Sequence, residues 1–160
     1  AIAVANLLGP LLLGHLFDTV GRRRMIAATY AVSGGLVAAG AVLFARGDLS
    51  AVTLTGLWAV TFFFASAAAS AGYLTVSEIF PVEMRAMAIA LFYALGTAVG
   101  GVLAPLLFGA LLETKSPWDL AYGYWLGAGL MLAAAATEWF VGIDAEGKAL
   151  EDIAAPLSAA

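Results

Sequence analysis

The chain alternates between long apolar runs and short polar joints. A helix needs about 20 largely apolar residues to cross the hydrocarbon core of a bilayer. Four runs reach that length, and a fifth, at the start of the chain, is apolar but slightly short. The pattern therefore predicts an all-α membrane protein with about four full transmembrane helices and one partial one, over residues 1–17, 25–45, 52–76, 86–112 and 120–141.

The two ends of the chain differ from its middle. The first run starts without a methionine and without a basic lead, which favours a fragment that begins inside a membrane helix over a signal peptide. Charged residues return after position 142. We therefore expect a transmembrane bundle over residues 1–142 and a tail over residues 143–160.

The amino-acid composition excludes several classes of protein and of functional site. Of the 160 residues, 63% are hydrophobic and 11% are charged, and the mean hydropathy is +0.98, whereas a soluble domain carries roughly a quarter charged residues. The chain has no cysteine and one histidine, His15, so thiolate catalysis is excluded and no metal site is expected. The seven basic residues form no basic face, which argues against nucleic acid as a partner. No catalytic set or phosphate-binding loop is present, so the sequence predicts no enzyme and no cofactor.

Basic residues are distributed unevenly between the two sides that alternating spans would create. The joints at 18–24 and 78–85 and the tail share one side, and the joints at 46–50 and 113–119 share the other. The first side holds five Lys or Arg residues and the second holds two. Because Lys and Arg accumulate in cytoplasmic loops, we expect the first side to be the cytoplasm.

The first polar joint, GHLFDTVGRRR, has a spacing of glycine and aspartate residues that a topological anchor, which needs only positive charge, does not require. Gly14, Asp18 and Gly21 precede three consecutive arginines at fixed offsets. A glycine at the end of a span allows a neighbouring helix to approach closely, and a second glycine permits the positive φ of a tight turn. The aspartate can accept hydrogen bonds from the first amides of the next helix or from an arginine.

This joint resembles the glycine-aspartate-glycine-arginine-arginine motif of the major facilitator superfamily. SEIFPVEMRAMA, Ser77–Ala88, is similar to a signature between helices 10 and 11 of the sugar porters in that superfamily, and EGKALEDIA, Glu146–Ala154, to the stretch after their helix 12. Together the three motifs imply the C-terminal part of a twelve-helix major facilitator bundle, from part of helix 8 to helix 12 and a cytoplasmic tail. The N-terminal half of the same transporter is then a missing partner.

The resemblance also implies a gating network at the cytoplasmic ends of the helices. Glu78 and Arg85 flank Pro81, which interrupts the backbone hydrogen bonding between two helices. We expect both to join the arginine-rich joint in a clamp that forms when the cytoplasmic side is closed. The alternative is that the arginines are only a charged topological anchor. The implied network comprises Gly14, Asp18, Gly21, Arg22, Arg23, Glu78 and Arg85.

Four positions are candidates for contact with a substrate. By resemblance, Asn6 matches a cavity-facing asparagine of sugar porters, and Phe64 and Tyr73 match aromatic cavity positions, the second of which is often tyrosine in organic-ion relatives. Thr97 is the fourth candidate, although Gly96-Thr97 departs from the polar residue and tryptophan that sugar porters commonly carry there in helix 11. Either aromatic residue could equally serve packing alone. Ala69-Ser70 replaces the usual Gly-Pro pair of helix 10, which weakens hexose as the substrate.

Two further titratable residues lie near the expected cytoplasmic ends of their spans. His15 has a side chain that can handle protons near neutral pH, but an interfacial location is the simpler explanation. Glu138, in the last turn of the final span, is expected to snorkel to the interface rather than to carry protons.

These observations favour a secondary active or facilitative transporter that moves a small polar solute, sugar-like or an organic ion or metabolite, by alternating access. Its partners would be the lipid bilayer of the plasma membrane, the small-molecule substrate and, as a candidate coupling ion, the proton. The choice among symport, uniport and antiport stays open. Two other interpretations also stay open: a transporter-like sensor or receptor without transport, and a structural membrane subunit.

Overall fold

The computed structural model describes residues 1–143, and these form five α-helices. Each helix is long and apolar enough to span a membrane, and the described residues contain no strand. The prediction of an all-α membrane fold is therefore confirmed. The predicted tail lies, apart from its first residue, outside the described part of the chain. The helices are α1 (Ile2–Thr19), α2 (Arg22–Arg46), α3 (Ala51–Ile79), α4 (Val82–Glu113) and α5 (Pro117–Val141).

Turn-forming residues set the ends of the helices. Gly21, at φ 110°, and Gly47, at φ 77°, occupy backbone conformations that other residues rarely adopt, and they flank α2. Pro81 separates α3 from α4, where the sequence predicts a break. Ser50 and Ser116 cap α3 and α5: the side-chain oxygen of each accepts a hydrogen bond from the amide three residues on, at 3.2 and 3.3 Å.

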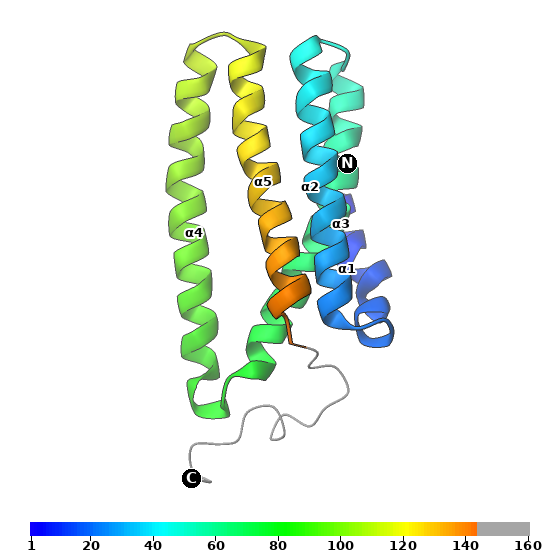
Figure 1. Ribbon diagram of the computed structural model, residues 1–160, viewed down its shortest axis with the longest axis vertical. Coiled ribbons are helices and arrows are strands. Elements are labelled where there is room, and N and C mark those ends of the chain that lie inside the picture. The colour runs from blue at the N-terminus through cyan, green and yellow to red at the C-terminus, as the bar shows by residue number, and fades with distance from the viewer. Residues whose placement is uncertain (144–160) are drawn as a thin grey trace.

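The packing is centred on α2 and α3. Helix α2 lies against both α5 and α3, and α1 lies against α3 (Figure 1). Helix α4 stands at the edge of the bundle, where it contacts α3 and α5 less extensively, and Ala88 is its one buried residue. The fold is thus a close-packed group of α1, α2, α3 and α5 with α4 along one side.

Small residues bring the packed helices close together. Gly9 of α1 lies so near α3 that a side-chain carbon on it would clash with the carbonyl oxygen of Phe63 and the Oγ of Ser66. Gly34 and Gly40 of α2 make the same kind of approach, to leucines of α5 and α3. Membrane helices commonly pack through small residues, because lipid supplies no hydrophobic force between them. The glycines therefore fix how closely α1, α2, α3 and α5 sit.

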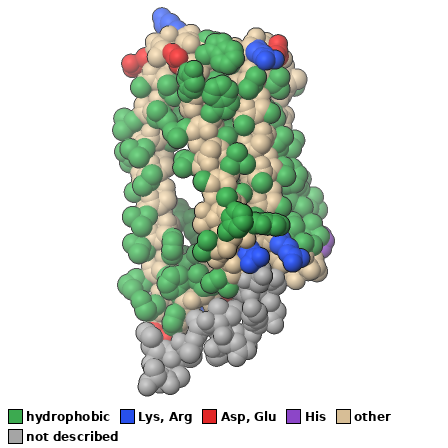
Figure 2. Space-filling model, in the orientation of Figure 1, with side chains coloured by type: hydrophobic (Ala, Val, Ile, Leu, Met, Phe, Trp, Pro, Cys, Tyr) green, Lys and Arg blue, Asp and Glu red, His purple; other side chains and the backbone are tan. Residues whose placement is uncertain are grey.

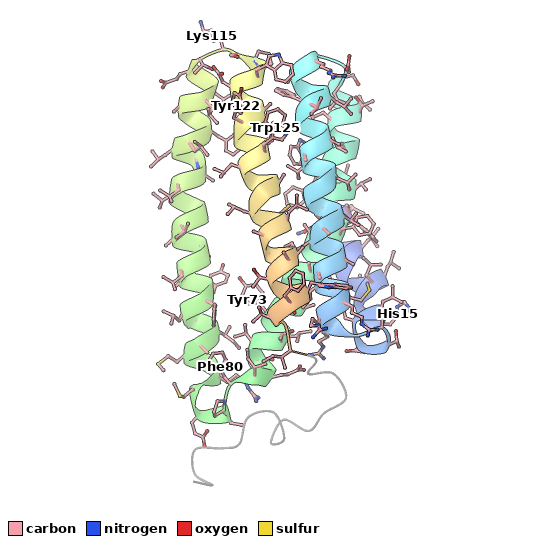
Figure 3. All side chains as sticks on the ribbon, viewed as in Figure 1. His15, Tyr73, Phe80, Lys115, Tyr122 and Trp125 are labelled. Carbon is pink, nitrogen blue, oxygen red and sulfur yellow. The ribbon has the colours of Figure 1, made fainter. Side chains whose placement is uncertain are left out.

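The four joints lie at two opposite ends of the bundle. The α1–α2 and α3–α4 joints are at one end, and the α2–α3 and α4–α5 joints are at the other (Figure 1). On the face shown in Figure 2, hydrophobic side chains cover the length of the helices and charged ones gather at the ends. Figure 3 shows Lys115 at the end opposite His15 and Phe80. We name these two ends the Arg22 end and the Lys115 end.

Candidate functional site

Arg22 joins three helices at the Arg22 end. Its guanidinium donates to Oδ1 of Asp18 in the last turn of α1, at 3.3 Å, and to Oε2 of Glu78 in the last turn of α3. Arg22 is itself the first residue of α2. We call these three residues, Asp18, Arg22 and Glu78, the Arg22 cluster. It connects the two polar joints that the sequence marks by their motifs.

The two ion pairs of the Arg22 cluster differ in burial. The Arg22 side chain is 13% exposed and the Glu78 side chain 20%, whereas the Asp18 side chain is 67% exposed. An exposed pair contributes roughly 0–1 kcal/mol, while breaking a buried pair leaves an uncompensated charge and costs several times more. The Arg22–Glu78 contact is therefore the stronger tie, and it is also the one that connects helices distant in the sequence.

Local geometry explains why Arg22 alone makes both contacts. Gly21, in its positive-φ conformation, turns the chain between α1 and α2 and leaves Asp18 four residues before Arg22. Successive residues on a helix point about 100° apart, so Arg22 and Arg23 face different neighbours. The cluster thus depends on the glycine turn as much as on the charges.

Arg23 and Arg85 do not share in this cluster. Both ion pairs found among the described residues belong to Arg22. Arg23 instead lies at the end of α5: its Cγ and the Oε1 of Glu138 are each 2.7 Å from where a side-chain carbon on Gly142 would lie. Arg85 follows the Pro81 break, and its Nε is buried with no hydrogen-bond partner in the described part of the chain. The network is therefore smaller than the seven expected residues.

Gly14 lies beside the Arg22 cluster, but no described helix packs closely against it, contrary to the prediction for this glycine. A side-chain carbon on Gly14 would meet no described atom within 4 Å. Instead Gly14 lines a cavity of about 220 Å³ together with Asp18, Arg22 and, from α3, Ser70 and other residues. The backbone of α1 approaches α3 most closely nearer the start of α1, at Gly9, whereas near its end Phe17 fills the space against alanines of α3.

The four substrate candidates are not gathered in one place. Asn6 of α1 and Thr97 of α4 are exposed on separate helices. Phe64 is half-buried and packs edge-to-face on Phe63, with ring centroids 5.2 Å apart. Tyr73 is exposed, and its ring lies 6.2 Å from that of Tyr93 on α4. Of the four, Tyr73 is the one that we place in a cavity lined by other polar groups.

That cavity has a volume of about 400 Å³ and lies where four helices converge. Tyr30 comes from α2, Tyr73 and Thr75 from α3, Phe92 from α4 and Glu138 from α5. The phenols of Tyr30 and Tyr73 and the carboxylate of Glu138 therefore line one space. Figure 3 shows Tyr73 closer to the Arg22 end than to the Lys115 end. We call this space the four-helix cavity.

The family of the chain follows from comparison with known proteins. Residues 1–157 match the model of the Major Facilitator Superfamily. The chain belongs to this superfamily. No curated protein and no solved structure matches it significantly. It is therefore an integral, multi-pass membrane protein of a transporter family.

Of the described residues that line the four-helix cavity in this member of the Major Facilitator Superfamily, Tyr73 alone was anticipated as a site residue; Tyr30 and Glu138 are among those that were not. Tyr30 sits in an apolar run that offers no signal of its surroundings. Glu138 was expected to snorkel, yet its Oε1 is buried and the residue lines the cavity. The general rule that an ionisable residue inside a membrane span marks a functional site would have singled out Glu138.

Proposed function

We propose that this chain is the C-terminal part of a secondary active or facilitative transporter that moves a small polar solute by alternating access. In this proposal the Arg22 cluster stabilises the closed state of the Arg22 end. The Arg22–Glu78 ion pair is the observation that carries this proposal. In alternating access, helical bundles rock about a site within the membrane and expose it to each side in turn. An ion pair that ties helix ends together stabilises the arrangement in which those ends are held together, and in this proposal it breaks when that end opens for the solute to leave.

We also propose that the Arg22 end faces the cytoplasm of a cell whose plasma membrane holds the protein. Arg22, Arg23, Arg24 and Arg85 belong to joints at this end, whereas the Lys115 end has Arg46 and Lys115. This distribution supports the orientation because positive residues are retained on the cytoplasmic side.

Single cysteines test this orientation without background, since the chain has none of its own. Asp48→Cys and Lys115→Cys, in exposed joints of the Lys115 end, should react with a membrane-impermeant thiol reagent in intact cells. Arg24→Cys, exposed at the Arg22 end, should react only after the cells are opened. Labelling of Arg24→Cys in intact cells, with the other two protected, would invert the topology.

The proposed substrate is a small polar solute, either sugar-like or an organic ion or metabolite. The sugar-porter resemblance of the Arg22 and Glu78 joints supports the first class. Tyr73 together with the replaced Gly-Pro pair at Ala69-Ser70 supports the second. Protons are the candidate coupling ion in either case.

If Tyr73 and Asn6 contact the solute, Tyr73→Ala and Asn6→Ala should each raise the apparent KM several-fold with little loss of protein from the membrane. The reason is that one lost hydrogen bond costs about 1 kcal/mol, or roughly fivefold in affinity. Tyr122→Ala, an exposed tyrosine at the Lys115 end, is the matched control and should transport normally. Unchanged kinetics in both test variants would assign these two residues to packing.

Flux separates this function from the main alternative, a sensor built on a transporter-like bundle. The purified protein in proteoliposomes should take up at least one member of a panel of radiolabelled sugars, organic cations and organic anions, faster than empty liposomes do. A solute that binds the protein and changes its accessibility, without any net uptake, would favour the sensor. That result would refute the transporter proposal.

A further inference from the structure

An open apolar groove runs between α2 and α5 toward the Arg22 end of the bundle. Its volume is about 340 Å³, and all the described residues that line it are apolar. Alanines of both helices, among them the buried Ala27 and Ala135, form its floor. The exposed side chains of Leu132, Trp139 and Phe140 stand along its α5 side. We name it the α2–α5 groove.

The small side chains of the floor explain why the groove exists. Helices α2 and α5 pack closely along their length (Figure 1), but alanines at their meeting face leave space that larger residues would fill. Ala28 and Ala136 are exposed, so the groove opens away from the described helices. Both helices are long and apolar enough to span a membrane. The apolar molecules available to fill such a groove in a bilayer are the hydrocarbon chains of its lipids.

Arg24 stands at the end of the groove. It precedes Ala27, Ala28 and Ala31 by three, four and seven residues, the spacing that places residues on one face of a helix. Arg24 therefore continues the groove face of α2 by one turn, toward the Arg22 end. Its side chain is exposed, and both ion pairs found among the described residues belong to Arg22 instead.

The aromatic residues of the groove lie at the same level as Arg24. Trp139 and Phe140 are in the last turn of α5, and that turn meets the first turn of α2, where Arg23 lies against Gly142. On the face shown in Figure 2, basic side chains border hydrophobic ones at this end. Tryptophan is enriched where hydrocarbon meets headgroups, and its indole N–H is a hydrogen-bond donor. The groove thus joins an apolar length to a cationic end at the interface.

We infer that the α2–α5 groove binds an anionic phospholipid of the surrounding membrane, with an acyl chain along the alanines and the headgroup phosphate at Arg24. A guanidinium can donate two parallel hydrogen bonds to phosphate oxygens. Basic sites beside spanning helices on the cytoplasmic side suit anionic headgroups. This site goes beyond the proposed function, because it concerns the lipid around the protein and needs no transported solute.

Charge and shape together favour this occupant over others. A free phosphate ion would gain the charge of Arg24 but nothing from the apolar groove. A phospholipid without net charge would fill the groove but bring its own positive group beside the arginine. An apolar helix laid in the groove would leave the charge of Arg24 without a counter-charge. Glu138, the residue before Trp139, lines the four-helix cavity and not this groove, so it is not a member of the site.

Phospholipids with brominated acyl chains test the inference, because bromine quenches the fluorescence of a tryptophan that it touches. The purified protein is placed in phosphatidylcholine bilayers with increasing fractions of brominated phosphatidylglycerol or brominated phosphatidylcholine. The signal of Trp139 is the part that Trp139→Phe removes. The anionic lipid should quench it at about one fifth of the mole fraction that the neutral lipid requires. Equal quenching by the two lipids would overturn the inference. So would the absence of quenching, because protein would then cover the groove.

Substitutions of exposed arginines assign the preference to Arg24. Arg24→Gln should abolish the roughly fivefold preference for the anionic lipid, whereas Arg24→Lys, which keeps the charge, should retain most of it. Arg46→Gln is the matched control, since it removes an exposed arginine from the other end of the same helix, and it should keep the full preference. An unchanged preference in Arg24→Gln would overturn the inference.

Two further measurements assign the acyl chain to the groove and the anion to a lipid. Ala28→Phe, which fills the groove, should reduce quenching of Trp139 by both lipids, whereas Ala39→Phe, at an exposed alanine of α2 outside the groove, should not. Undiminished quenching in Ala28→Phe would overturn the inference. Millimolar inorganic phosphate should leave quenching by the anionic lipid unchanged. Its loss would show that Arg24 binds a free anion, and the lipid site would be refuted.

Discussion

Glu78→Gln will shift the protein toward the state that is open at the Arg22 end, by roughly thirtyfold. The substitution keeps the shape of the side chain but removes the charge that faces Arg22, whose guanidinium is only 13% exposed. For a pair intermediate between surface and core, the loss is about 2 kcal/mol, which corresponds to roughly thirtyfold in an equilibrium constant. A cysteine at Ser70, in the cavity beside the Arg22 cluster, should react faster with a thiol reagent applied from that end.

Asp18→Asn is the matched control for this prediction. It makes the same change of charge toward the same arginine, but the Asp18 side chain is 67% exposed and screened by solvent. Its effect should stay within about 1 kcal/mol, or roughly fivefold. Equal effects of the two substitutions would mean that net charge at this end matters and that the specific contact does not. Wild-type reactivity and wild-type flux in Glu78→Gln would reduce the arginines to a topological anchor.

Gly9→Ala will destabilise the contact between α1 and α3. The added carbon meets the carbonyl oxygen of Phe63, which belongs to the α3 backbone and cannot rotate away. Overpacking of this kind typically costs about 1–3 kcal/mol. The expected result is a clear fall in the unfolding temperature of the purified protein in detergent, measured by intrinsic fluorescence.

Gly35→Ala provides the comparison for Gly9→Ala, since a side-chain carbon at Gly35 of α2 would meet no described atom within 4 Å. It should leave the unfolding temperature unchanged or raise it slightly, because alanine favours the helical state over glycine. If both variants unfold at the wild-type temperature, the close contact at Gly9 does not contribute to the stability of the bundle.

Apolar run length predicted the helices, but their ends required other signals. Helix α4 begins at Val82, before the predicted start at 86, because a helix continues through charged residues at the interface where an apolar count stops. The breaks at Gly21 and Pro81 could be predicted, since each follows from the backbone limits of one residue type. Element bounds were therefore most predictable where local sterics set them.

The site was predictable only in part, for a physical reason. The motif resemblance pointed to Asp18, Arg22 and Glu78, and the structure brings these three together. It could not indicate that Arg23 turns toward α5, because the direction of each side chain depends on how α2 is rotated against its neighbours. Membrane helices are apolar on all sides, so no periodic pattern reveals that rotation in the sequence.

The four-helix cavity could not be predicted from the sequence either, because its residues come from distant segments. Tyr30 and Glu138 lie on α2 and α5, far apart in the sequence, and line the same cavity because these two helices pack together. Gly34 allows that packing, since a larger residue there would press on Leu132. No local signal in either segment indicates that the two residues share a cavity. Convergence of this kind depends on tertiary packing and becomes visible only in the structure.

A double-mutant cycle on Arg22 and Glu78 tests the central claim most directly. The labelling rate of the Ser70 cysteine is measured in the parent protein, in Arg22→Gln, in Glu78→Gln and in the double variant. If the ion pair itself holds the Arg22 end closed, the second substitution adds little to the first, and the coupling free energy is about 2 kcal/mol. Additive effects, with a coupling energy near zero, would contradict the account, because the two residues would then act independently.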